Sequence, residues 1–275
     1  MYTQSMHAET STQTLFEFIR DNPLGILTTA IPSTTQPLIQ STHIPWILDT
    51  DGEPHPSNLG NAQANAGENE SPPARLRGHI ARQNPQSATL IEAVQSLGLP
   101  SGSYLPHETH EVMILFTSPH HHYVTPKFYT ESKPATGKVA PTWNYSAVQA
   151  YGTIRVYFDP AAEETGAYLD HQIRDLSAHC EGHAMGFTGA ENGRPEAWRV
   201  DEAPEGYLKV LKRNIVGLEV DVRRISGKVK MSQEKGGGDR EGVIGGFKAL
   251  GTQTGDVIAR LVTERGEMKD RKREK

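Results

Sequence analysis

The clearest pattern in the chain is an alternation of apolar and polar residues over two long segments. From residue 148 to 158, mostly apolar residues at even positions alternate with polar or aromatic residues at odd positions. From residue 216 to 223, valine and leucine alternate in the same way with glycine and charged residues. Because successive side chains of a strand point to opposite faces, both segments are predicted to be antiparallel strands with one buried face.

Shorter extended and helical runs complete the predicted order of elements. Asn84 and Pro85 are predicted to open a helix as its N-cap and first turn, and Gly98 to end it. Strands outnumber long helices and do not alternate with them, so we expect a mainly β (α+β) fold, an antiparallel barrel with peripheral helices. Further strands are predicted at 24–31, 38–48, 75–81, 111–117 and 120–125, and further helices at 11–21, 160–179 and, in two pieces, after residue 238.

Changes in composition mark the predicted boundaries. Residues 50–73 contain almost no large apolar side chain, so ordering them would cost conformational entropy with little burial to offset it, and a flexible loop is predicted. Residues 265–275 are mostly charged and are predicted to form a disordered tail. We expect a barrel core at 1–158, which includes the loop, and a second part at 159–264, a helix followed by the strand and helices that complete the barrel or dimer.

Charge and targeting signals narrow the range of partners. The net charge of −5 argues against attraction of the whole surface to nucleic acid, so any DNA binding would have to be local. The single cysteine, Cys180, cannot form an intramolecular disulfide, and no leader pattern is seen. No apolar run approaches the roughly twenty residues that cross a bilayer. The expectation is a cytoplasmic protein without membrane contact.

Several short segments at predicted strand ends are dense in polar and aromatic residues. They are Ser41–Pro45, Gly78–Pro85, Tyr123–Tyr129 and Pro141–Tyr145, and a further block is Gly227–Gln233 followed by Arg240–Ile244. In their order and spacing these blocks resemble those of PaiB-type proteins, the FMN-binding negative transcriptional regulators. The resemblance spans residues 15–250.

The resemblance implies a split barrel that works as a homodimer and holds FMN at the subunit interface. A flavin phosphate needs a guanidinium, hydroxyl groups and backbone N–H groups, which Arg82, Thr42 and the helix start at Asn84 could supply. Arg82 is the leading phosphate ligand. Within the same block as Thr42, His43 is a further cofactor-binding candidate.

An isoalloxazine ring needs flat apolar cover and a few hydrogen-bond donors at its edge. Thr142, Trp143 and Asn144 could supply these groups, and Lys127 and Gln233 are lesser candidates. Plain structural roles compete with each assignment: Arg82 could pair with a surface carboxylate, Trp143 could belong to the core, and His43 and His79 could be hydrogen-bonded structural histidines. Only the coincidence of these residues in the blocks favours a site.

The function predicted from these residues is an FMN-dependent oxidoreductase that acts on a small molecule. The alternative is a PaiB-like regulator without turnover, although no helix-turn-helix pattern or basic recognition face supports DNA binding. A lesser alternative is haem, with axial ligands among His107, His110 and the triplet 120–122. Because adjacent strand residues face opposite ways, the triplet cannot converge on one metal ion, and no metal site is predicted.

Overall fold

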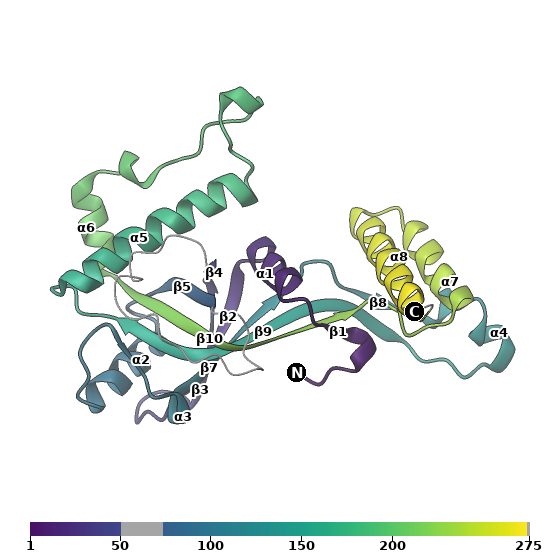
Figure 1. Cartoon of the computed structure of the whole chain (residues 1–275), viewed down its shortest axis with the longest axis horizontal. Helices are drawn as coiled ribbons and strands as arrows, with labels where there is room; N and C mark the ends of the chain where they lie inside the picture. The colour runs from purple at the N-terminus through teal and green to yellow at the C-terminus, as the bar shows by residue number, and fades with distance from the viewer. Residues whose placement is uncertain (51–73, 274–275) are drawn as a thin grey trace. The chain divides into compact units, whose positions relative to one another are not determined.

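The computed structural model describes residues 1–50 and 74–273, so the loop predicted at 50–73 lies, apart from Thr50, outside the described residues. The chain divides into two compact units. Unit 1 comprises Met1–Ser11, Thr117–Val148 and Ser226–Lys275, and unit 2 comprises Thr12–Phe116 and Gln149–Ile225. Two of the points at which the chain changes from one unit to the other lie within long strands, β9 (Thr142–Tyr157) and β10 (Ile215–Lys230) (Figure 1).

Unit 2 contains an antiparallel barrel. In the sheet order β3-β2-β7-β9-β10-β5-β4, the two end strands β3 and β4 are separated in the chain only by Trp46. Since β3 pairs with β2 and β4 pairs with β5, the sheet returns to itself and closes. The bounds of its other strands are β2 (Leu24–Ala30), β3 (Ile39–Pro45), β4 (Ile47–Thr50), β5 (Ala74–Ala81), β6 (Ser103–Tyr104) and β7 (Glu111–Thr117). The prediction of a mainly β, antiparallel barrel with peripheral helices is confirmed.

The alternating pattern decides which side chains fill the barrel. In the pairing of β10 with β5, Val216 lies opposite Ile80 and Val220 opposite Leu76, and all four are buried. The odd-numbered residues of β10 point to the other face of the sheet. Burial of the even-numbered side chains contributes hydrophobic stabilisation to this unit.

Helices cover the barrel of unit 2 from outside. They are α1 (Thr12–Asp21), α2 (Pro85–Ser96), α3 (His107–His110), α5 (Glu163–His179), the π turn Cys180–Ala184, the short helical turns Ala190–Asn192 and Val200–Glu202, and α6 (Glu205–Arg213). Tyr168 of α5 packs on β10 where residue 217 is glycine, because a Cβ there would lie 2.5 Å from the tyrosine ring. The Tyr168 hydroxyl donates to the carbonyl of Gly78 at 3.2 Å.

A buried ionic cluster lies between β4, β5 and α5. Arg77 is only 4% exposed, and its guanidinium binds both oxygens of Asp49 at 2.5 and 2.8 Å and one oxygen of Asp175 at 2.8 Å. Burial alone would lower the pKa of Arg77, but the two carboxylates outweigh burial and raise it. Nearby, His79 Nδ1 lies 2.7 Å from Gln172 Oε1, so His79 is a hydrogen-bonded structural histidine.

Unit 1 is built around a helical hairpin and the outer ends of β9 and β10. Its elements are the turn Ser5–His7, β1 (Ala8–Glu9), β8 (His122–Val124), the turn Pro126–Phe128, α4 (Ser132–Thr136), α7 (Gly237–Lys248) and α8 (Gln253–Arg273). Phe247 of α7 and Val262 of α8 share a core with Met231 and Val124. Residues 265–273, expected to form a disordered tail, continue α8 instead, which corrects that prediction.

Some helices and strands have the bounds predicted from the sequence, and others differ from them. Helix α1 lies where it was predicted, and the Asn84 side chain caps α2 by accepting from the N–H of Gln86 at 2.8 Å. Strand β9 begins at Thr142 and is therefore longer than the predicted strand from 148. Helix α6 was not predicted. The predicted boundaries at 158 and 264 do not coincide with the ends of the two units.

Of the helices in the described part of the chain, none is both long and apolar enough to cross a membrane.

Candidate functional site

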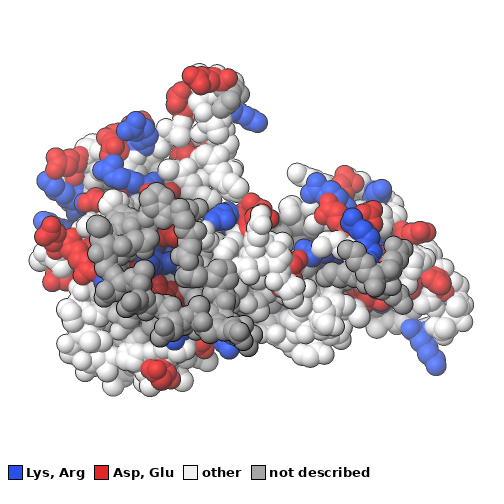
Figure 2. Space-filling model, viewed as in Figure 1, with Lys and Arg blue, Asp and Glu red and all other residues white. Residues whose placement is uncertain are grey.

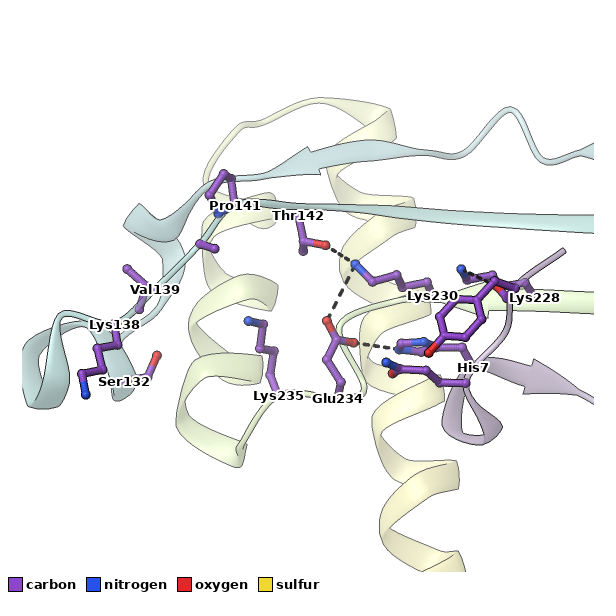
Figure 3. A pocket seen from close by; sticks show the side chains of 13 residues that line it. His7, Ser132, Lys138, Val139, Pro141, Thr142, Lys228, Lys230, Glu234 and Lys235 are labelled. Carbon is purple, nitrogen blue, oxygen red and sulfur yellow. Dashed lines mark hydrogen bonds and ion pairs between the residues drawn. The ribbon is translucent and has the colours of Figure 1, made fainter.

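A pocket of about 560 Å³ opens within unit 1, and it is rich in lysine (Figure 3). Three stretches of the chain line it: the N-terminus, the segment 132–142 and the segment 228–235. We call it the lysine pocket. The charged side chains and the histidine that line it are Lys138, Lys228, Lys230, Lys235, Glu234 and His7.

Strand β10 and the turn that follows it carry most of these groups. Lys228 and Lys230 are alternate residues of β10 and therefore lie on the same face of the strand. Figure 3 shows the Lys230 ammonium directed at Thr142, whose hydroxyl accepts a hydrogen bond from it. Lys230 Nζ also donates to the carbonyl of Trp143 at 3.2 Å. The strand end thus presents a fixed cation beside a hydroxyl.

Glu234 is the one carboxylate among the described residues that line the lysine pocket. Its Oε1 lies 3.9 Å from Lys230 Nζ, and its Oε2 lies 3.2 Å from Nε2 of the buried His7. Four lysines and one glutamate leave a net charge of +3 when His7 is neutral. The pocket therefore has an excess of positive charge that its own side chains do not neutralise.

The remaining lysine contacts involve aromatic rings and a carbonyl, which carry no full negative charge. Lys235 Nζ lies 4.2 Å from the centre of the Tyr129 ring, and Lys228 Nζ lies 5.3 Å from that of Tyr145. Lys228 also donates to the backbone carbonyl of Tyr2 at 3.1 Å. These contacts position the ammonium groups without cancelling their charge.

Two predicted cofactor ligands, Gln233 and Asn144, make hydrogen bonds to the turn that follows β10. Gln233 is buried; its side chain accepts from the N–H of Met231 at 2.6 Å and donates to the carbonyl of Val229 at 2.6 Å. The hydroxyl of Ser232, whose φ of +57° is in the left-handed region, donates to Asn144 Oδ1 at 3.0 Å. Gln233 and Asn144 therefore hold the turn between Lys230 and Glu234.

Trp143 lies at the surface next to Thr142. Its side chain is 48% exposed, so the interpretation of Trp143 as a core residue is wrong. The indole N–H donates to His121 Nδ1 at 3.3 Å, and the Tyr123 ring stands edge-on at 6.1 Å. An exposed aromatic surface is thus available close to the lysine pocket in the sequence. Lys127 is exposed and does not line the pocket.

Of the predicted ligands in unit 2, Arg82, Asn84 and Thr42 make hydrogen bonds within the fold. Arg82 donates to the carbonyls of Arg213 at 2.9 Å, Phe158 at 2.6 Å and Ile215 at 3.3 Å. The structure does bring Asn84 and Thr42 together, with Nδ2 3.2 Å from Oγ1, but the Asn84 oxygen already caps α2. His43 is exposed on β3.

The histidines considered for haem lie in both units. His107 and His110 bound α3 in unit 2, whereas His122 of unit 1 packs edge-on against Phe247, with ring centres 5.2 Å apart. Within residues 1–50 and 74–273, no group of three His, Cys, Asp or Glu side chains is arranged to hold a metal ion.

Sequence reasoning missed the lysine pocket itself, although Thr142, a predicted cofactor ligand, lines it and two of its lysines lay in a quoted block. Lys228 and Lys230 belong to the C-terminal block Gly227–Gln233, where their spacing of two was the available signal. His7, Lys138 and Lys235 come from segments that carried no such signal.

Comparison with known proteins identifies relatives of the chain. The family model described as "Putative FMN-binding domain" matches residues 1–224. An uncharacterized protein of Aspergillus fumigatus is 56% identical over 272 residues, which are 99% of this chain and 100% of that protein. "Protease synthase and sporulation protein PAI 2" of Bacillus subtilis is 24% identical over 245 residues, 89% of this chain and 87% of that protein.

Solved structures with a similar chain path were also found. The flavocytochrome Anf3 from Azotobacter vinelandii matches with a TM-score of 0.39 and 11% identity, over 81% of this chain and 69% of that one. The FAD and heme binding protein from Mycobacterium smegmatis matches with a TM-score of 0.39 and 12% identity, over 82% and 73% of the two chains.

Proposed function

The chain belongs to the FMN-binding domain family, and from this premise we propose that the lysine pocket of unit 1 receives the phosphate group of FMN. The observation that carries this proposal is the excess of positive charge in the pocket. A phosphate monoester carries close to two negative charges at neutral pH and binds best to several cationic and hydroxyl donors together.

The donor set of the pocket fits this group. Lys230 and Lys228 supply ammonium groups, and Thr142 supplies a hydroxyl already oriented by Lys230. The family match ends at residue 224, so Thr142 lies within it and the two lysines lie beyond it. The role of the lysines therefore rests on the pocket itself.

The isoalloxazine ring needs a different surface from the phosphate. The exposed indole of Trp143 follows Thr142 directly, and the ring of Tyr123 stands beside it, so both are candidates to cover the flavin. When bound, FMN supplies electron and hydride transfer chemistry. The role of the chain is to bind and orient the flavin, and we propose that it does so as a flavin-dependent oxidoreductase acting on a small molecule.

The phosphate assignment is tested by titrating the protein with FMN and, separately, with riboflavin, which lacks the phosphate. Lys230→Ala is expected to weaken FMN binding by about 10- to 100-fold, the loss of one charge-assisted hydrogen bond, and to leave riboflavin binding unchanged. Lys248→Ala, a change at an exposed lysine of unit 1 outside the pocket, is the matched control. An equal loss of affinity for FMN and for riboflavin would contradict the phosphate assignment. Absence of FMN binding by the wild-type protein would overturn the proposed function.

The redox assignment is tested separately. Under anaerobic conditions, NADH or NADPH is expected to bleach the absorption of the bound FMN. A protein that retains FMN but is reduced by neither nucleotide would favour the alternative function, a flavin-binding regulator without turnover.

A further inference from the structure

The charge of Glu234 is shared between two side chains of the lysine pocket. Glu234 Oε1 lies 3.9 Å from Lys230 Nζ, and Glu234 Oε2 lies 3.2 Å from His7 Nε2. Figure 3 shows the carboxylate between these two groups, with Lys230 also directed at Thr142. One oxygen of Glu234 therefore faces the cation proposed to bind phosphate, and the other faces a histidine.

The two contacts of Glu234 differ in strength. At 3.2 Å the contact with His7 is a hydrogen bond, whereas the 3.9 Å contact with Lys230 is an ion pair without one. Lys230 makes its hydrogen bonds to the Thr142 hydroxyl and the Trp143 carbonyl instead. A phosphate that contacts Lys230 repels the Glu234 carboxylate, and His7 is already in place to pair with it.

The fold fixes the position of His7 in the wall of the pocket. Its side chain is only 5% exposed. Immediately after it, β1 pairs with β10, with Ala8 opposite Lys228. Immediately before it, Gln233 Nε2 donates to the carbonyl of Met6 at 3.2 Å. His7 is therefore held by backbone contacts on both sides.

The charge of the pocket depends on whether His7 is protonated. Histidine is the side chain that ordinarily changes charge between pH 5 and 8, and a protonated ring forms a charge-assisted hydrogen bond with a carboxylate. Protonation raises the net charge of the pocket from +3 to +4. The Glu9 carboxylate, two residues from His7, is already paired with Arg265 of α8 at 2.7 Å. The other titratable or charged side chains that line the pocket are Tyr2, Lys138, Lys228 and Lys235.

We propose that His7 and Glu234 couple phosphate binding to the uptake of a proton. The proposal rests on the proposed function, because it requires the FMN phosphate in the lysine pocket. Without phosphate, Glu234 shares its charge with Lys230. When the phosphate contacts Lys230, Glu234 pairs with His7, and His7 Nε2 takes up a proton from solution. FMN therefore binds more tightly as the pH falls through the range in which His7 becomes protonated.

Calorimetric titration with FMN in two buffers of different ionisation enthalpy measures the protons that the protein takes up. At neutral pH the wild-type protein is expected to take up about 0.3–0.5 more protons per FMN than His7→Gln. The FMN phosphate itself titrates near this range, but it does so with both proteins and cancels in the difference. Equal proton uptake by wild type and His7→Gln would overturn the proposal. Absence of FMN binding by wild type would instead show that the proposed function is wrong.

A second variant tests the carboxylate and does not disturb the buried ring. At pH 8, where a neutral His7 leaves the Glu234 charge uncompensated, Glu234→Gln is expected to bind FMN about 10-fold more tightly than wild type. It is also expected to take up no more protons than His7→Gln. Unchanged or weaker FMN binding by Glu234→Gln at pH 8 would contradict the role of this carboxylate.

Glu241→Gln, at an exposed glutamate of α7 that does not line the pocket, is the matched control. Figure 2 shows side chains of both charges next to one another over α7 and α8. Loss of one exposed carboxylate there is therefore expected to leave FMN affinity and proton uptake at the wild-type values. An equal gain in FMN affinity from Glu241→Gln and Glu234→Gln would show a general effect of net charge and would overturn the proposal.

Discussion

The two units differ in how their cations are paired with carboxylates. In unit 2, the buried guanidinium of Arg77 has each nitrogen bonded to a carboxylate of Asp49 or Asp175. In unit 1, four lysines share an open pocket with one described carboxylate, Glu234. In the first arrangement a buried cation is bonded to carboxylates at every nitrogen, and in the second the cations outnumber the carboxylate.

The difference follows from the cost of removing charge from water. A buried cation needs matched anions, because the loss of hydration would otherwise exceed any gain from the fold. The lysines of unit 1 remain near solvent and can be left unmatched until an anion binds. Buried cations that are bonded to carboxylates are therefore expected to govern stability, whereas an excess of cations near solvent is expected to govern ligand binding.

The largest expected effect is on the matched cluster. Arg77→Ala leaves two carboxylates, one of them mostly buried, without their cation, and is expected to lower the free energy of unfolding by about 3 kcal/mol. Urea unfolding measures this loss. Arg260→Ala, which removes a cation from an exposed pair with Glu264, is the control and is expected to cost less than about 0.5 kcal/mol. Equal losses in the free energy of unfolding for the two variants would show that burial of the cation does not increase its contribution to stability.

Arg82 gives a sharper test, because it was the leading phosphate ligand predicted from the sequence. Its three hydrogen bonds to backbone carbonyls indicate a structural role, so Arg82→Ala is expected to lower stability by about 1–2 kcal/mol and to leave FMN affinity unchanged. Fluorescence titration with FMN at a temperature where the variant is folded measures the affinity. A loss as large as that caused by Lys230→Ala would place the phosphate site in unit 2 instead.

A smaller effect concerns Glu219, a buried carboxylate of unit 2 that is only partly matched. Its Oε1 accepts from the Tyr104 hydroxyl at 3.1 Å, with Arg75 Nε and Arg155 Nη1 at 3.7 Å. Burial raises the pKa of Glu219 above its ordinary value of 4.5, Arg75 and Arg155 oppose this rise, and Asp221 adds to it.

The raised pKa predicts a definite pH dependence. The folded protein keeps the Glu219 proton over a range where the unfolded chain has lost it, so this group stabilises the fold fully below its ordinary pKa of 4.5. That contribution is lost as the pH rises from 4.5 through the folded pKa. Glu219→Gln removes it, so the stability of the variant relative to wild type is expected to increase with pH in urea unfolding. If the free energies of unfolding of wild type and Glu219→Gln changed with pH in parallel, Glu219 would not titrate in this way.

The sequence predicted the barrel better than the pocket, for a physical reason. Val216 and Val220 repeat with the period of a strand, and Asn84 with Pro85 forms a local helix start, so both features are readable from a few adjacent residues. The lysine pocket instead requires His7, Thr142 and Lys230 to come together from distant segments. Alternating lysines at a strand end also look like an ordinary solvated face.

The same distinction applies to the predicted ligands that already bond within the fold. Gln233 and Asn144 lie in the right blocks, but both are buried: the Gln233 side chain bonds within its own turn, and the Asn144 oxygen accepts from Ser232 of that turn. Arg82 stands beside a helix start, as a phosphate ligand would, but its guanidinium already donates to the carbonyls of Phe158 and Ile215. Residue type and spacing indicate which chemistry is available, while only the tertiary contacts decide whether a group is already used.

The smallest expected effect on stability, and a distinct effect on the ligand, belongs to Trp143. Because its ring is 48% exposed, Trp143→Ala removes little buried surface and is expected to change the free energy of unfolding by less than about 1 kcal/mol. An indole that covers the flavin quenches its fluorescence, so the bound FMN of the variant is expected to be brighter than that of wild type. Tyr207→Ala, at a ring of unit 2 that is 57% exposed, is the matched control and should leave the bound-flavin emission unchanged. Identical emission from wild type and Trp143→Ala would show that Trp143 does not cover the flavin ring. The lysine pocket would remain the proposed phosphate site, because the two assignments rest on different side chains.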